Sequence, residues 1–264
     1  MTTRTDTARN ISQWSNLGIE LPKQLADKIA VFDAVSWVET GHQVVVDTSK
    51  ITVKNAENAV ADLALRLLPA QVDPSTRRSA LEQARLTIQD QLALEILREA
   101  TKAVPEVVEQ LRPIFDDAVA QYVGAVAELP GELNYESLFG AGPSAQASYG
   151  SALAAVKTIR EIDVWLTGLT SLPEFWNLGL EGEPLFLFRV LSPATRGEVN
   201  ELWDARRRAQ TNTADAVEID LDPMFLYAAR NGIEWGINTP AESVAIRERI
   251  EETAVVSPVK HIRL

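Results

Sequence analysis

The sequence predicts a mainly α fold, a long amphipathic helical hairpin or bundle followed by a smaller mixed α+β C-terminal part. Apolar residues recur every three or four positions over most of residues 21–172, which is the spacing of one helix face. Proline and glycine interrupt these runs at intervals typical of helix lengths. After Pro173 short apolar runs alternate with Gly and Pro, which indicates shorter elements of both kinds.

The N-terminal third contains a polar arm and two predicted helices. Residues 1–20 are expected to form a flexible arm, because polar residues dominate their first part. A helix is predicted from Leu21 to Val38, followed by Gly41 and a short strand at Val44–Val46. A second helix opens near Thr52, and its apolar side consists of Val60, Leu63, Ala64, Leu67 and Leu68.

Residues 74–129 have the most regular helical spacing in the chain and predict two consecutive helices separated by Pro105. Pro113 predicts a kink in the second helix. The apolar stripe is wider than a coiled-coil seam, which favours a bundle. It is also long for a domain of this size, so we expect part of it to contact another chain. The candidate interface residues are Leu81, Ile88, Leu92, Ile96, Leu111, Phe115 and Val119.

The rest of the chain is predicted to contain a loop, a helix and a smaller region. Residues 129–150 are rich in Gly and Pro and predict a loop, and the helix after it completes a helical domain over residues 21–172. Within the mixed region 173–256, strands are expected at 185–190 and 216–221, and helices are expected to open at Pro193, Pro223 and Pro240. Residues 257–264 are expected to form an extended tail.

Composition argues against several classes of function. The net charge of −12 disfavours contact with nucleic acid or an anionic membrane. The chain has no cysteine, so disulfides, thiolate catalysis and cysteine metal sites are excluded. No apolar run approaches the 18 or so residues of a membrane span, and no secretory signal is visible. We therefore expect a cytoplasmic protein without a cofactor, whose partners are copies of itself or other protein subunits.

Three carboxylates are the only candidate metal ligands that the sequence offers. Glu218, Asp220 and Asp222 alternate with apolar residues, and a strand would place them on one face, where Mg²⁺ or Ca²⁺ could bind. The simpler interpretation is a charged edge strand that resists pairing with other strands. No glycine turn or additional ligand accompanies the three residues, so we prefer the edge strand.

Other motifs have structural interpretations. The glycine-rich segment 138–150 lacks the lysine and the preceding strand of a phosphate loop, so a flexible loop with Ser144 or Ser148 as a helix cap is preferred. The two histidines, His42 and His261, form no recognisable catalytic set. Arg206, Arg207 and Arg208 follow acidic residues by one helical turn, which favours local ion pairs over nucleic-acid binding.

Two classes of function remain. The first is a structural or assembly protein that acts through contacts of its long amphipathic helices, for which a phage virion is one setting. The alternative is an enzyme with an acidic and aromatic pocket where the helical and C-terminal parts meet. Its lining would be formed by the carboxylates near Asp220 together with Trp176, Trp203, Tyr227 and Trp235.

Overall fold

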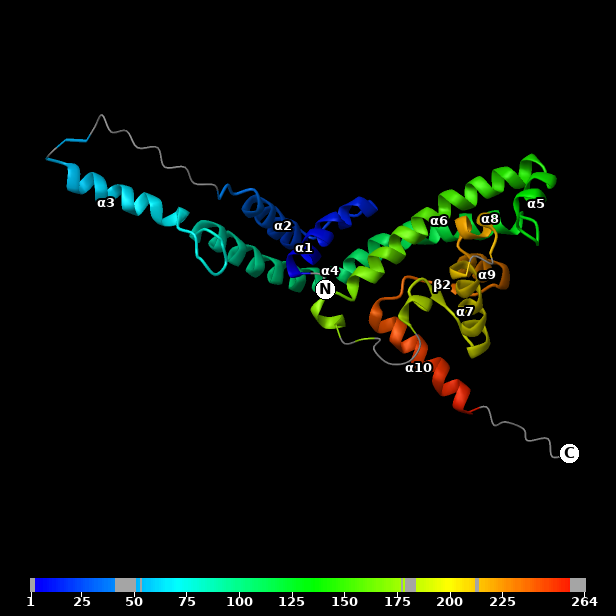
Figure 1. Cartoon of the computed structure of the whole chain (residues 1–264). Coiled ribbons are helices and arrows are strands. Elements are labelled where there is room, and N and C mark those ends of the chain that lie inside the picture. The colour runs from blue at the N-terminus through cyan, green and yellow to red at the C-terminus, as the bar shows by residue number, and fades with distance from the viewer. Residues whose placement is uncertain are drawn as a thin grey trace. The chain divides into compact units, whose positions relative to one another are not determined.

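The computed structural model describes residues 3–40, 51–52, 54–176, 178, 184–211 and 214–256. The chain divides into two compact units (Figure 1). Unit 1 comprises Met1–Ser12 and Leu21–Ala100, and unit 2 comprises Gln13–Glu20 and Thr101–Leu264. The domain boundary predicted near residue 172 therefore falls inside unit 2. The strand predicted at Val44–Val46, both histidines and the predicted tail lie outside the described residues.

The described elements of unit 1 are helical, and the sequence predicts helices in the regions of α2, α3 and α4. Its elements are α1 (Arg4–Ser12), α2 (Lys23–Ser36), α3 (Ala56–Leu67), the 3-10 turn η3 (Leu68–Ala70) and the first part of α4 (Ala80–Ala127). The helix α2 lies beside α4 and is joined to it by an ion pair between Lys28 and Glu95 (Figure 1). Apolar side chains of α2 and α4 form the core of the unit, namely Leu25, Ile29, Phe32, Ala93, Ile96 and Leu97.

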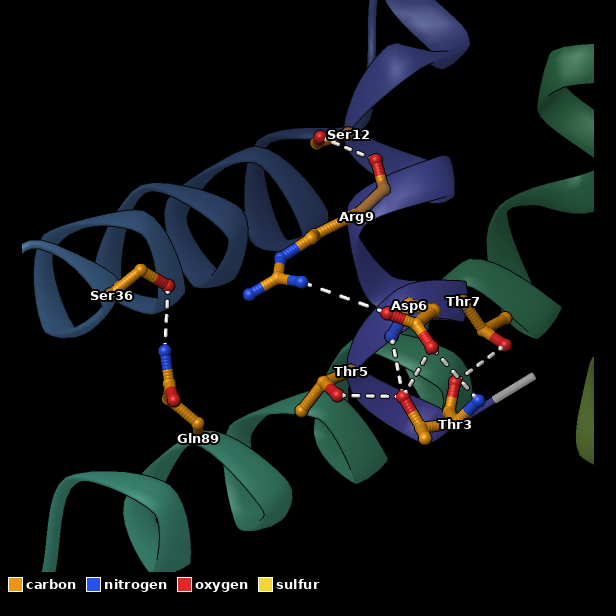
Figure 2. Close-up of polar contacts among 8 residues, drawn as sticks. All are labelled: Thr3, Thr5, Asp6, Thr7, Arg9, Ser12, Ser36 and Gln89. Carbon is orange, nitrogen blue, oxygen red and sulfur yellow. Dashed lines mark hydrogen bonds and ion pairs between the residues drawn. The ribbon is translucent and has the colours of Figure 1, made fainter. Parts of the chain in front are cut away.

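The N-terminal segment is a helix, so the prediction of a flexible arm is wrong for its described residues. The Thr3 hydroxyl accepts a hydrogen bond from the Asp6 amide, while the Thr3 amide and hydroxyl both donate to the Asp6 carboxylate (Figure 2). This reciprocal pair satisfies amides that a helix start leaves without partners. Burial of Ile11 holds α1 in place. Figure 2 also shows Gln89 of α4 donating to the Ser36 hydroxyl of α2 at 2.9 Å.

Helix α4 is continuous through Pro105 and Pro113, which corrects the prediction of two helices separated at Pro105. A proline inside a helix removes one backbone hydrogen bond and costs about 3 kcal/mol in an isolated helix. Here both rings lie on the exposed side. The opposite side is buried on either side of them, through Val104, Val107, Val108, Leu111 and Phe115. Burial of that continuous stripe offsets the lost hydrogen bonds.

Unit 2 has a helical part and a small C-terminal α+β part. The helical part consists of η1 (Gln13–Leu17), the rest of α4, α5 (Tyr135–Gly140) and α6 (Pro143–Leu169). Helix α6 lies beside α4, and Gln121 of α4 donates to the Ser151 hydroxyl of α6 at 3.0 Å (Figure 1). Trp14 of η1 packs edge-on against Trp165 of α6. The segment 129–150, which the sequence predicts as a loop, contains the helix α5. The N-cap of α6 is Gly142, not the predicted Ser144 or Ser148.

The C-terminal part contains short helices and a two-stranded antiparallel sheet. Its elements are η4 (Pro173–Phe175), η5 (Leu185–Leu187), β1 (Leu191–Ser192), α7 (Arg196–Gln210), α8 (Ala216–Leu221), α9 (Pro223–Asn231), β2 (Glu234–Trp235) and α10 (Pro240–Val256). Leu191 pairs with Trp235 and Ser192 with Glu234. The mainly α fold with a small α+β C-terminal part is thus confirmed. The strand predicted at 185–190 is wrong, because η5 occupies 185–187 and β1 begins at Leu191.

Residues 216–221 form a helix, not the predicted strand. The Asp215 side chain accepts a hydrogen bond from the Val217 amide and caps the helix start. Val217 and Leu221 are both buried, and their spacing of four residues places them on one helix face. Six residues that alternate between apolar and acidic side chains are too few to distinguish a strand from a helix. The Asp215 cap and the burial of Val217 and Leu221 determine that the segment is a helix.

Candidate interaction surface

Helix α3 is an amphipathic helix with no buried residue in the described structure. Val60, Leu63, Ala64 and Leu67 follow helical spacing on one side of it. Nevertheless the Val60 side chain is 68% exposed, and Leu67 is also exposed. A short helix gains little stability from propensity alone and is held mainly by packing of its apolar side. The apolar side of α3 therefore lacks the covering that such a helix ordinarily has.

A hollow lies at the C-terminal end of α3. It has a volume of about 350 Å³ and is lined by Ala64, Leu67, Leu68, Ala70 and Gln71. All but one of these side chains are apolar. The Gln71 carbonyl accepts a hydrogen bond from the Ala80 amide at 3.2 Å, which ties the wall of the hollow to the first turn of α4. The hollow is thus an apolar depression that is anchored on a long helix.

The end of α2 adds further apolar residues near the start of α4. Arg85 of α4 donates from Nη1 to the Val38 carbonyl at 3.1 Å, and Arg85 lies about 8 Å along the helix from Ala80. Beside Val38, Trp37 is 86% exposed, an unusual position for the largest apolar side chain. We define the apolar surface of unit 1 as the exposed large apolar residues at the end of α2, on the Val60 side of α3 and just after α3, namely Trp37, Val38, Val60, Leu67, Leu68 and Val72. Clustered exposed apolar residues of this kind mark interaction sites.

The interface residues predicted from the sequence lie elsewhere, on α4. Ile96, Leu111 and Phe115 are buried in the core of their own chain, so for these three the interface prediction is wrong. Leu81, Leu92 and Val119 are half-buried, and Ile88 is half exposed. The sequence gives both α3 and α4 an apolar side, and the spacing is more regular in α4. In the described residues, α4 has buried side chains and α3 has none. A sequence pattern alone does not show which apolar side will be packed.

The three carboxylates considered as metal ligands do not form a joint site. Because residues 216–221 are helical, Glu218, Asp220 and Asp222 do not share one strand face. Asp220 accepts a hydrogen bond from the Tyr149 hydroxyl at 3.1 Å, and burial together with this bond raises the pKa of Tyr149 to about 12. Within the described ranges, no group of three or more His, Asp or Glu side chains is arranged to hold a metal ion.

Asp222 instead starts helix α9. Its side chain accepts hydrogen bonds from the amides of Met224 and Phe225, and Pro223 occupies the first helical position. Asp222 adopts a positive φ of 65°, which costs free energy for any residue with a Cβ. Burial raises the pKa of the Asp222 carboxyl above its usual range, although Arg160 lies 3.8 Å from it and acts in the opposite direction. Asp-Pro at residues 222–223 is the sequence signal for this cap.

Tyr122 completes the polar cluster around Asp222. The Tyr122 side chain is fully buried, and its hydroxyl donates to the Leu221 carbonyl at 2.6 Å. Burial is the main cause that raises the pKa of Tyr122, and the Asp222 carboxylate adds to it. Arg160 donates to the neighbouring Ile219 carbonyl at 3.0 Å. These contacts hold the α8–α9 turn against α4 and α6, so the cluster has a clear structural role.

Asp222→Asn is expected to change how stability depends on pH. A carboxyl whose pKa is raised by folding binds protons more tightly in the folded state, so its contribution to stability falls as pH rises from about 4 through the raised pKa. Asn keeps the cap and tolerates a positive φ but cannot ionise. The free energy of unfolding of wild type relative to Asp222→Asn should therefore decrease between pH 4 and pH 8. Urea denaturation at several pH values measures this difference.

Glu218→Gln is the control for this experiment, because it removes a carboxylate from α8 without altering the α9 cap. A difference between wild type and Asp222→Asn that is constant over the pH range, or that grows with pH, would contradict the assignment of a buried, raised-pKa carboxyl to Asp222.

The aromatic residues considered for an enzyme pocket lie in separate contacts within unit 2. Trp235 packs against Tyr122 and Phe225, with ring centroids 5.9 and 5.5 Å apart. Trp203 packs edge-on against Phe186. Trp176 is exposed and donates from its indole nitrogen to the Ser171 carbonyl at 2.7 Å. Trp203 and Trp235 therefore pack against other aromatic side chains, and these contacts do not bring them together around one cavity.

The arginine cluster contacts neighbouring side chains, and Arg207 forms a local ion pair of the kind that the sequence predicts. The Arg206 guanidinium lies over the Phe186 ring at 4.9 Å from its centroid. Arg207 forms an ion pair with Asp204, one helical turn earlier. These contacts are consistent with a helix surface stabilised by neighbouring side chains.

Comparison with known proteins gave no match, whether the chain was compared with protein-family models, with curated proteins or with solved structures. Among the helices of the described residues, none is both long enough and apolar enough to span a bilayer. The function must therefore be argued from the surface described above.

Proposed function

We propose that this protein is a structural or assembly subunit, which acts by binding other protein chains through the apolar surface of unit 1. The observation that carries the proposal is that α3 presents an amphipathic helix whose apolar side is exposed. Water contact with Val60, Leu67, Leu68 and Trp37 is unfavourable, and a covering protein would bury them. A virus particle such as a phage virion is one assembly that would use such a subunit.

The surface has the features of a protein-binding site rather than of a small-molecule site. The hollow beside α3 is lined almost entirely by apolar side chains and contains no ionisable group. Chemistry on a substrate requires convergent polar or charged groups. Binding of a partner requires apolar anchors and a depression that receives a side chain, and an exposed Trp is the type of residue that contributes most to such interfaces.

The test compares the native assembly state of two α3 variants. Tagged full-length protein is expressed in the cells that normally produce it, and its mass distribution is measured by sedimentation of the gently lysed cells. Wild type is expected in a fraction much heavier than the 29.0 kDa monomer. Val60→Asp should shift the protein to the light fraction, because a charge in a buried apolar interface is unfavourable.

Leu65→Asp is the matched control, since Leu65 is 65% exposed against 68% for Val60 and lies on the opposite side of the same helix. It should leave the protein in the heavy fraction. Wild-type protein that sediments only as a monomer would contradict the assembly function. An equal shift for both variants would contradict the use of this particular side of α3.

A further inference from the structure

We propose that the partner covering the apolar surface of unit 1 is a second copy of this chain, with the two α3 helices packed antiparallel across a two-fold axis. This inference rests on the proposed function and specifies its partner.

The charge of the chain is concentrated in unit 2. Counted from the sequence, unit 1 contains 11 Lys and Arg against 12 Asp and Glu, whereas unit 2 contains 14 against 25. The net charges are therefore −1 and −11. Two copies that approach through unit 2 repel each other more strongly than two copies that approach through unit 1. The nearly neutral unit is also the one that carries the exposed α3, so docking there keeps the repulsion between the copies small.

The apolar side of α3 is complementary to itself in an antiparallel pair. Ala56, Val60, Leu63 and Leu67 are separated by four, three and four residues, the spacing of a helix-packing seam. A two-fold axis at the helix midpoint brings Val60 opposite Leu63 of the second copy and Ala56 opposite its Leu67. Because Asp62 lies away from this seam, no pair of acidic side chains meets within it. The pairing therefore matches apolar with apolar residues at each layer.

The size of the surface indicates a moderately stable dimer. The 12 residues of α3 extend about 18 Å, so an α3 pair alone buries less than the roughly 800 Å² per partner of a standard interface. Leu68, Val72 and Trp37 extend the surface beyond α3, and the shallow hollow at the end of α3 adds apolar area to it. We therefore expect a dissociation constant of the dimer in the range of about 1–100 μM.

Sedimentation equilibrium of the purified full-length chain tests the proposal. The wild type should change from monomer to dimer as its concentration rises from about 0.5 to 200 μM. Val60→Asp should remain monomeric, with the dissociation constant of the dimer raised at least tenfold. Val164→Asp should dimerise like the wild type, since Val164 of α6 is 69% exposed and undergoes the same substitution in unit 2. Circular dichroism of both variants verifies that helix content is retained.

Salt concentration provides a second readout of the same equilibrium. Raising the ionic strength from 0.05 to 0.5 M screens the repulsion between the two acidic units, so the proposed dimer should become tighter. An association that weakens with salt would overturn the proposal, because it would indicate an ionic contact between unit 1 and the acidic unit 2 of a second copy. A dimer that Val60→Asp leaves intact would overturn it equally.

Single cysteines test the geometry without a destabilising charge, since the chain contains no cysteine of its own. Val60→Cys should give a bismaleimide-linked dimer under conditions in which Val164→Cys gives none, because the two Val60 positions lie on the same seam about one helical turn apart. Absence of cross-linking for Val60→Cys would overturn the antiparallel α3 pair. A purified chain that stays monomeric at every concentration also rejects the second copy, while a heavy fraction in cells would still support the assembly function with a different protein as partner.

Discussion

Phe115→Ala is expected to lower the free energy of unfolding of unit 2 by about 3–5 kcal/mol, the range for removing a large side chain from a packed core. Phe115 is 1% exposed and lies on the buried side of α4 between Leu111 and Ala118, which are also buried. Truncation to Ala leaves a cavity that neighbouring side chains fill only partly. Phe115 lies ten residues after Pro105 in α4. Burial of side chains such as Phe115 stabilises this helix, which lacks a backbone hydrogen bond at the proline.

Guanidinium chloride denaturation followed by tryptophan fluorescence measures this effect. Trp14, Trp165, Trp176, Trp203 and Trp235 belong to unit 2, and the remaining Trp37 of unit 1 is already exposed when folded, so the signal reports mainly on unit 2. Val164→Ala, on the exposed side of α6, should change the unfolding free energy by less than about 0.5 kcal/mol. A loss below about 1 kcal/mol for Phe115→Ala would contradict the position of Phe115 in the core.

Asp163→Ala is expected to destabilise unit 2 by about 2–4 kcal/mol. Arg189 binds the Asp163 carboxylate through two parallel hydrogen bonds, from Nε to Oδ1 at 2.6 Å and from Nη2 to Oδ2 at 2.8 Å. The two side chains are only 19% and 20% exposed. Removal of Asp163 leaves the Arg189 cation largely shielded from water without its anion, which costs more than the loss of an exposed ion pair.

Glu161→Ala on the same helix is the matched control for Asp163→Ala. Glu161 pairs with Lys157 at 4.0 Å, and both side chains are mostly exposed, so its loss should cost less than about 0.5 kcal/mol. Equal effects of the two substitutions would show that the Asp163–Arg189 pair does not join α6 to the chain before β1. Arg189→Met should partly restore stability in the Asp163→Ala background, because it removes the unpaired charge.

The helices themselves were predictable because local rules determine them. Pro223 and Pro240 begin α9 and α10, as the sequence indicates, and α7 follows Thr195, which forms a reciprocal capping pair with Glu198. Proline at the first position and a side-chain cap act within one helical turn. Such signals are therefore complete in the sequence, and the mainly α class follows from them together with apolar periodicity.

Residues 216–221 show where local reasoning failed. Six residues that alternate between apolar and acidic side chains fit one face of a strand, yet Val217 and Leu221 also fit one face of a helix. Over so short a segment the two periods cannot be separated. The burial of Val217 and Leu221 on one helix face decides between them, and that burial exists only in the folded chain.

The apolar side of α3 could be predicted from the sequence, but its exposure could not. An apolar side is visible in the sequence both for α3 and for the long stretch that became α4. The sequence analysis assigned the interface to α4, where Ile96, Leu111 and Phe115 prove to be core residues. An amphipathic pattern states that a face must be covered, and it does not state whether the same chain or another one covers it.

The sequence by itself determined the helical class, the starts of α9 and α10, and the apolar faces of the long helices, since these depend on interactions within a few residues. The tertiary structure decided that α4 continues through Pro105, that Asp222 is a partly buried helix cap, and that α3 retains an exposed apolar side. Each of these outcomes depends on burial by residues distant in the chain. Burial of a stripe can compensate for a lost hydrogen bond, raise the pKa of a carboxyl or leave a helix face uncovered, and it is set only when the chain packs.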